Sequence, residues 1–331
     1  MADPAISSQP PIAYKDRRTA LIVFGVLTIA MGSVMALFIP LMLFGATIAA
    51  KEPGSGEMYQ MLIPACVMYG ALAVALIWLG IGSAMARRWA RALLLIFSWS
   101  WLVVGVIATT STAFVLPKAF AVSAALQQQR GQPQLPPSAQ SIVLAITLIF
   151  YAVIFIFLPA IWVWFYQSNN VRATCQARDP HPRWTDRSPL PVIALSLWLA
   201  FGSLAMLALP FAYRGVFPFF GTFLSGIPGT TIYLVMAVIW AYAVWILFRL
   251  QLRGWWLAFV VICVWSTSSV LTCLHHDLDE MYQLMGIPQQ QTAMVQQLGL
   301  FNRQLMAWSS FGFTVPFLGY LLFIRRYFRR T

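Results

Sequence analysis

Residues 169–189, NNVRATCQARDPHPRWTDRSP, divide the chain into two parts that are each mostly apolar. The stretch combines four arginines with two aspartates and three prolines, so its residues favour water over a hydrophobic environment. Long apolar runs flank it on both sides. We therefore interpret it as a linker between a first membrane unit, residues 1–168, and a second membrane unit, residues 190–331.

The composition excludes an ordinary soluble fold. Of the 331 residues, 60% are hydrophobic and only 9% are charged, and the mean hydropathy is +0.76. Soluble domains carry roughly 25% charged residues, which they need to cover their surface. A lipid-facing surface needs none, so we predict an all-α integral membrane protein. The net charge of +12 is better explained by basic membrane loops than by nucleic-acid binding.

The apolar runs are long enough to cross a bilayer, which takes about 20 helical residues. The eight runs cover approximately residues 19–49, 61–85, 92–117, 142–166, 190–213, 230–248, 255–274 and 305–324. Gln- and Pro-rich segments separate the third run from the fourth and the seventh from the eighth. We predict eight transmembrane helices.

Residue matches between the halves indicate an internal duplication. The matched positions are Gly32 and Gly202, Pro40 and Pro210, Arg87 and Arg253, Trp89 and Trp255, and Pro159 and Pro316. Because each half contributes four crossings, the chain returns to its starting side, and the halves form two parallel four-helix repeats. We expect the matched glycines to permit close helix approach. We expect kinks at the prolines Pro40, Pro159, Pro210 and Pro316.

Charge predicts the orientation. With eight crossings, 16 of the 21 Lys and Arg residues fall on one side. Positive residues accumulate in cytoplasmic loops, so we predict a multi-pass protein of the bacterial cytoplasmic (inner) membrane, with both termini and the linker cytoplasmic. The basic turn at residues 86–91, ARRWAR, belongs to this side. Its arginines are suited to lipid phosphates, and Trp89 to the membrane interface.

A polar cluster, CLHHDLDE at residues 273–280, is expected at the outer end of the seventh helix. Its candidate metal or proton ligands are Cys273, His275, His276, Asp277, Asp279 and Glu280. If the helix continues here, these residues form neighbouring pairs four positions apart. Thiolate, imidazole and carboxylate groups bind zinc or copper, although one helix supplies only two or three ligands. The alternative is that the cluster marks where the helix leaves the bilayer.

The third and seventh helices are rich in hydroxyl groups. The candidate residues for a polar path are Ser98, Ser100, Thr109, Thr110, Ser266, Thr267, Ser269 and Thr272. Intramembrane polar side chains usually face the interior of a helix bundle. They either line such a path or only join helices by hydrogen bonds. The predicted hydrocarbon core has no ionisable Asp, Glu, Lys, Arg or His, which argues against a proton-coupled transporter.

Three functional interpretations remain open. The first is a transporter-like or lipid-interacting protein with its pathway between the two repeats. The second is a noncatalytic subunit or assembly factor that binds partner helices of a larger membrane complex. The third is a membrane metal-binding protein or enzyme that uses the outer His/Asp/Glu cluster. We predict no catalytic residue and no cofactor, zinc or copper at that cluster excepted, and we expect membrane lipids as partners.

Overall fold

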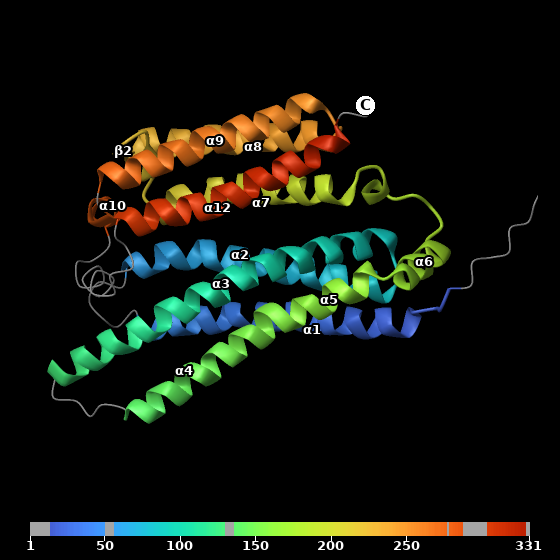
Figure 1. Ribbon diagram of the computed structural model, residues 1–331, viewed down its shortest axis with the longest axis horizontal. Coiled ribbons are helices and arrows are strands. Elements are labelled where there is room, and N and C mark those ends of the chain that lie inside the picture. Colours follow the sequence, from blue (N-terminus) through green and yellow to red (C-terminus); the bar gives the residue numbers. More distant parts are fainter. Residues whose placement is uncertain (1–13, 50–55, 130–135, 277, 287–302, 329–331) are drawn as a thin grey trace, which may run out of the picture.

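The computed structural model describes residues 14–49, 56–129, 136–276, 278–286 and 303–328 (Figure 1). The first part contains α1 (Arg18–Ala49), α2 (Gly56–Ala84), α3 (Arg88–Gln129), α4 (Pro137–Ala152), the π-helix η1 (Val153–Phe157) and α5 (Leu158–Gln167). The linker forms α6 (Asn169–Arg178) and the 3-10 helix η2 (Trp184–Asp186). The second part contains α7 (Leu190–Ala212), β1 (Phe217–Phe219), β2 (Thr222–Leu224), α8 (Gly226–Phe248), α9 (Leu252–His275), α10 (Leu278–Met285), α12 (Arg303–Ile324) and the 3-10 helix η3 (Arg325–Tyr327).

The long helices carry large apolar side chains on their outer surface. Ile227 is 83% exposed and Trp164 is 78% exposed, and many other aromatic and aliphatic residues point outward. Within the described residues, seven helices are long and apolar enough to cross a membrane. Contiguous apolar surface of this extent is unfavourable in water and suited to lipid. These observations confirm the prediction of an all-α membrane protein.

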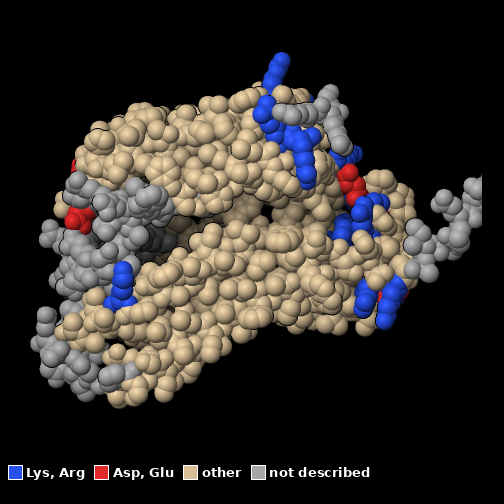
Figure 2. All heavy atoms as spheres, viewed as in Figure 1, with Lys and Arg blue, Asp and Glu red and all other residues tan. Residues whose placement is uncertain are grey.

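Two groups of helices lie side by side (Figure 1). In the first, α1 packs against α2, and α3 packs against α4, η1 and α5. In the second, α7 packs against α8, and α9 packs against α8 and α12. The groups meet chiefly where α7 approaches α2 and α3, and Trp198 Nε1 donates a 2.9 Å hydrogen bond to Ser100 Oγ there. Figure 2 shows a hollow between the two groups on the viewed face.

Glycines allow the first two helices of each group to pack closely. A Cβ added to Gly32 would lie 2.9 Å from the carbonyl oxygen of Ala73 on α2. A Cβ added to Gly202 would lie 2.1 Å from the ring of Trp240 on α8. Both distances are far below an ordinary van der Waals contact, so the prediction that Gly32 and Gly202 permit close helix approach is confirmed.

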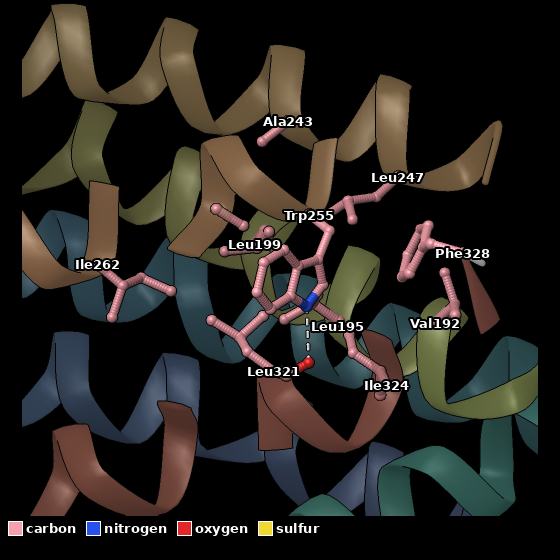
Figure 3. Packing of buried hydrophobic residues seen from close by; sticks show 11 residues of the cluster. Val192, Leu195, Leu199, Ala243, Leu247, Trp255, Ile262, Leu321, Ile324 and Phe328 are labelled. Carbon is pink, nitrogen blue, oxygen red and sulfur yellow. Dashed lines mark hydrogen bonds between the residues drawn. The ribbon is translucent and has the colours of Figure 1, made fainter. Parts of the chain in front are cut away.

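The two larger clusters of buried hydrophobic residues lie toward the end of the helices next to the linker. Figure 3 shows the core of the second group, in which Trp255 at the start of α9 donates a 2.7 Å hydrogen bond from Nε1 to the carbonyl oxygen of Leu321. The core of the first group surrounds Leu94, Trp162 and Tyr166 at the same end. Toward the opposite end, α3 and α4 run obliquely away from α1 and α2 (Figure 1). The linker end is therefore the better-packed end of the first group.

Three local features were not predicted from the sequence. Helix α3 continues to Gln129, well past the predicted end near residue 117, because no residue of 118–129 stops a helix. The segment between α7 and α8 forms a short antiparallel hairpin. Its two turn residues, Phe220 and Gly221, both have positive φ, as in a hairpin turn of type I′. Helix α9 ends at His275, so residues 273–280 do not form one continuous helix.

The four prolines occupy two kinds of position. Pro40, Pro210 and Pro316 lie inside continuous α-helices, and Pro159 is the second residue of α5, which begins where the π-helical turn η1 ends. Because proline has no amide hydrogen, Pro159 cannot bond to the carbonyl oxygen of Phe155 four residues earlier. This carbonyl lies against Gly105 of α3. The kinks predicted at these prolines stay predictions.

Candidate functional site

Arginines gather at one end of the helices, which we call the basic end. It comprises the start of α1, the α2–α3 turn, the linker, the α8–α9 turn and η3 (Figures 1 and 2). Its described Lys and Arg residues are Lys15, Arg17, Arg18, Arg87, Arg88, Arg91, Arg172, Arg178, Arg183, Arg187, Arg249, Arg253, Arg325 and Arg326. Lys118 and Arg214 lie toward the opposite end. The described residues therefore have the charge asymmetry that the sequence suggested.

A buried aspartate fastens the linker to the first group. The Asp179 side chain is only 2% exposed, and its carboxylate accepts a 2.7 Å hydrogen bond from Arg183 Nη2. It also accepts a 3.3 Å bond from the backbone N–H of Arg88 at the start of α3, and Arg87 Nη1 lies 3.8 Å away. The hydrogen bond from Arg183 is the main reason that the pKa of Asp179 is lowered below its ordinary value. Asp179 is therefore ionised at neutral pH.

Further contacts tie the linker to both groups. Toward the first group, Arg17 N donates to Thr174 Oγ1 over 3.0 Å. Toward the second group, Ser188 Oγ donates to the carbonyl oxygen of Phe248 over 3.4 Å, and the rings of Trp184 and Phe248 lie 6.0 Å apart. The linker is thus an ordered element that joins the basic ends of both groups.

A cavity of about 230 Å³ lies between the linker and the starts of α3 and α7. We call it the linker pocket. Helix α3 contributes its first turn, α6 and η2 contribute the linker side, and Leu190 begins α7. The lining residues are Arg88, Arg91, Ala92, Arg172, Cys175, Gln176, Thr185, Asp186, Ser188 and Leu190.

The charges of the linker pocket are unbalanced. Arg88 Nε lies 3.3 Å from Asp186 Oδ2, so one arginine is paired. Among the residues that the structure describes, neither Arg91 nor Arg172 forms an ion pair with a carboxylate. Two lining groups, Arg91 Nε and Thr185 Oγ1, are buried and have no hydrogen-bond partner in the described part of the chain. Buried donors of this kind are normally satisfied, so the pocket is suited to an anion.

The sequence predicted only part of this pocket. The basic turn at residues 86–91 was expected to contact lipid headgroups, and it supplies Arg88 and Arg91. The contributions of Arg172 and Thr185 were missed, because they depend on how the linker folds back against α3. The sequence contains one indication of these contributions, which is that the linker has several arginines together with two aspartates.

The outer cluster has a different geometry from the one expected. His275 Nδ1 lies 2.8 Å from the carbonyl oxygen of Leu271, and His276 Nδ1 lies 2.6 Å from Glu280 Oε2. Cys273 is a half-buried free thiol on α9, whereas Asp279 and Glu280 belong to the first turn of α10. Asp277 lies outside the described residues. In the part of the chain that is described, no three His, Cys, Asp or Glu side chains converge to hold a metal. Zinc or copper binding stays a prediction.

Several hydroxyl groups of the predicted polar path form internal hydrogen bonds. The bonds join Ser98 Oγ to the Leu94 carbonyl (2.6 Å), Ser100 to Trp198 (2.9 Å), Ser266 to Thr314 (2.6 Å), Thr267 to the Cys263 carbonyl (2.8 Å) and Thr272 to the Ser268 carbonyl (2.9 Å). Thr110 is exposed, Ser269 is half-buried, and Thr109 Oγ1 is buried with no partner among the described residues. The path itself stays a prediction.

Hydroxyls of α9 hold the hairpin in place. The backbone N–H of Gly221 donates to Thr272 Oγ1 over 3.0 Å, and that of Phe220 donates to Ser268 Oγ over 2.9 Å. Ser268 Oγ in turn lies 3.1 Å from the carbonyl oxygen of Pro218. Ser268 was not among the predicted residues, because nothing in the sequence indicated that the hairpin would fold onto α9.

We expect Thr272→Val to loosen the hairpin. The substitution preserves shape but leaves the Gly221 N–H without its acceptor, at a cost of about 1–2 kcal/mol. Hydrogen exchange of residues 217–224 should accelerate roughly 5- to 30-fold. Thr267→Val is the matched control, because Thr267 is exposed and bonds only within its own helix. Equal exchange rates in both variants would contradict the assigned role of Thr272.

The fold and the linker pocket together define an α-helical integral membrane protein with a cationic cavity at the basic end. Comparison of the chain with protein-family models, with curated proteins and with solved structures finds no match. Function is therefore inferred from the residues of the chain itself.

Proposed function

We propose that the protein is a lipid-interacting protein of the bacterial inner membrane, with anionic lipid bound at its basic end and lipid contact along the hollow between its two helix groups. In this proposal the chain spans the bilayer eight times as two parallel four-helix repeats. Both termini and the linker face the cytoplasm. The observation that carries the proposal is the linker pocket, whose walls come from both groups and whose arginines exceed its carboxylates.

The proposed topology draws on the helix pairing and on charge. Helix α12 has 22 residues and packs beside α9, so it has the length of an eighth span. The matched residues Gly32 and Gly202 both lie where the first two helices of a group meet, α1 with α2 and α7 with α8, which fits a duplication. Basic residues at one end fit a cytoplasmic location for that end.

The depth of the linker pocket favours lipid as the ligand. Its walls include the first turns of α3 and α7, two helices apolar enough to span the membrane. Phosphate groups of lipids lie at the same level as the ends of spanning helices, and the cytoplasmic leaflet is rich in anionic lipids. The stacked rings of Trp78 and Trp89, with centroids 4.4 Å apart, provide aromatic surface near this level.

A transport path through the interior has less support. Ser98, Ser266 and Thr272 use their hydroxyls for bonds within or between helices. A path for a polar solute needs groups that are available to the solute. Lipid contact at the surface needs no such interior groups, and this difference favours lipid interaction over solute transport.

Native mass spectrometry of the purified full-length protein tests this function. We expect one or more anionic lipids to remain bound after delipidating detergent washes. Added phosphatidylglycerol or cardiolipin should raise the thermal unfolding temperature more than phosphatidylcholine does, because bound ligand stabilises the folded state. Equal effects of the three lipids together with no retained lipid would exclude lipid interaction and favour a role as a subunit of a larger complex.

A further inference from the structure

We propose that the linker pocket binds a phosphate monoester, a dianionic group, and thereby couples the two helix groups. This inference deepens the proposed function, on which its membrane source rests, by naming the headgroup chemistry. The same chemistry occurs in a lipid such as phosphatidic acid and in a soluble phosphorylated metabolite. The charge and the hydrogen-bond donors of the pocket favour a phosphate monoester. Titration with a lipid probe and a soluble probe distinguishes the two sources.

The charge of the pocket matches a dianion. Three lining arginines and one lining aspartate leave two positive charges, since Asp186 pairs with Arg88 and leaves Arg91 and Arg172 without a carboxylate. A phosphate monoester carries about −1.5 to −2 at neutral pH, whereas a phosphodiester or a carboxylate carries only −1. The monoester is therefore the common biological anion that neutralises the pocket most completely.

The unpartnered hydrogen-bond donors of the pocket are suited to the oxygen atoms of a phosphate group. Arg91 Nε and Thr185 Oγ1 are both buried without a partner in the described residues, and Thr185 is only 4% exposed. A guanidinium forms paired, directional bonds to phosphate oxygens, and a threonine hydroxyl adds a short neutral donor. Two buried donors that line one cavity thus gain partners together when a phosphate enters.

Helix α3 strengthens the preference for an anion. Arg88 and Arg91 belong to its first turn, and the whole helix is 42 residues long and ends at Gln129. The first turn of a helix carries partial positive charge from its unpaired N–H groups and aligned dipoles. Because the N–H of Arg88 already bonds to Asp179, the positive charge of the helix N-terminus adds to anion binding by the arginine side chains and does not substitute for it.

Among the lining residues of the pocket, Asp186 alone carries a negative charge, and that charge is paired. Burial raises the pKa of Cys175 to about 11, so its thiol is neutral at physiological pH. The carboxylate of Asp186 is occupied by Arg88 and by the N–H of Arg183, which donates over 2.8 Å. A cavity of about 230 Å³ holds several waters at roughly 30 Å³ each, which is room for one phosphate group.

Ligand binding would add to the contacts that already hold the linker between the two helix groups. Arg91 belongs to the first group, Arg172 and Thr185 to the linker, and Leu190 to the second group. A phosphate held by Arg91, Arg172 and Thr185 fixes the linker against α3. The linker in turn carries the start of α7, so the bound anion stabilises one arrangement of the two groups.

The test is titration of the detergent-purified full-length protein with three probes, followed by calorimetry. The probes are glycerol 3-phosphate, dioctanoyl phosphatidic acid and dioctanoyl phosphatidylglycerol. We expect both monoesters to bind saturably at one site, and the diester to bind at least about tenfold more weakly than phosphatidic acid, because it carries one charge fewer. Tighter binding of phosphatidic acid than of glycerol 3-phosphate assigns the site to lipid, and equal affinities assign it to a soluble metabolite.

Variants connect the binding to the pocket. Arg91→Gln should weaken monoester binding roughly 10- to 100-fold, and Thr185→Val should weaken it several-fold. Arg187→Gln is the matched control, because Arg187 is an exposed linker arginine outside the pocket wall. If Arg91→Gln fails to give monodisperse protein, Arg172→Gln takes its place.

Three results would overturn the proposal. They are the absence of saturable monoester binding, equal affinity for phosphatidic acid and phosphatidylglycerol, and equal losses in Arg91→Gln and Arg187→Gln. Lipid retention separates this inference from the broader function. If lipids remain bound in the mass spectrometer while no monoester binds, only the pocket proposal fails. If glycerol 3-phosphate binds while no lipid is retained, only the lipid function fails.

Discussion

Asp179→Asn is expected to destabilise the protein by about 2 kcal/mol and to release the linker from α3. The buried carboxylate holds Arg183, receives the N–H of Arg88 and lies beside Arg87. An asparagine keeps the shape but removes the charge that these donors share. Breaking a fully buried ion pair costs roughly 3–5 kcal/mol, and we expect less here because 37% of the Arg183 side chain is exposed. Thermal unfolding in detergent, followed by tryptophan fluorescence, measures the loss.

The matched control is Asp16→Asn. Asp16 pairs with Arg178 over 3.0 Å, but both side chains are exposed, and exposed ion pairs contribute little to stability. If the two variants unfold at the same temperature, Asp179 does not have the fastening role assigned to it. Hydrogen exchange across residues 176–190 adds a local measurement, since Asp179→Asn should accelerate exchange there.

The role of Asp179 also predicts how the stability of the protein depends on pH. The pKa of Asp179 is lowered in the folded protein, chiefly by the hydrogen bond from Arg183. A lowered pKa contributes stability that is fully present above the unfolded-state pKa and is lost as pH falls through the folded-state pKa. The stability difference between wild type and Asp179→Asn should therefore be largest at neutral pH and should shrink below the ordinary carboxyl pKa. A difference that grows on acidification contradicts this assignment.

The membrane architecture could be predicted because apolar length and charge placement are properties of the sequence. Seven of the expected spans appear as long apolar helices with their large side chains outward, within the described residues. The end of α3 could not be placed, because a Gln-rich segment reads equally well as a loop or as a helix. The hairpin at residues 217–224 was also missed, because its turn amides depend on Ser268 and Thr272 of a distant helix.

The candidate site was predictable only in part, for a similar reason. The arginines at residues 86–91 are visible as a basic turn, and their role toward phosphate follows from their chemistry. The burial of Thr185 and the pairing of Arg88 with Asp186 arise from the tertiary fold of the linker. Contacts between residues that lie far apart in the chain produce no periodic pattern that can be recognised in a single sequence. The outer histidines show the opposite case: this conspicuous motif pairs His276 with Glu280, but its described residues form no group of three metal ligands.

Gly105→Ala is expected to lower the stability of the first group by at least about 2 kcal/mol. A Cβ added at residue 105 would lie 1.9 Å from the carbonyl oxygen of Phe155 and 2.8 Å from its carbonyl carbon. These are backbone atoms, so no side-chain rotation can relieve the overlap. Pro159 denies this carbonyl its usual helical partner, which lets its oxygen lie against the backbone of α3. The methyl group would push α3 away from the α4–α5 helix.

Gly45→Ala separates this overlap from the general effect of replacing a helical glycine. Gly45 lies in α1, and a Cβ there would meet nothing within 4 Å. Alanine favours helix more than glycine does, by roughly 1 kcal/mol in an exposed helix, so Gly45→Ala should be neutral or stabilising. Gly105→Ala gains the same helix preference and should still unfold at a lower temperature, because the contact with Phe155 dominates. Equal unfolding temperatures for Gly105→Ala and Gly45→Ala would contradict the close packing of α3 against the π-helical turn.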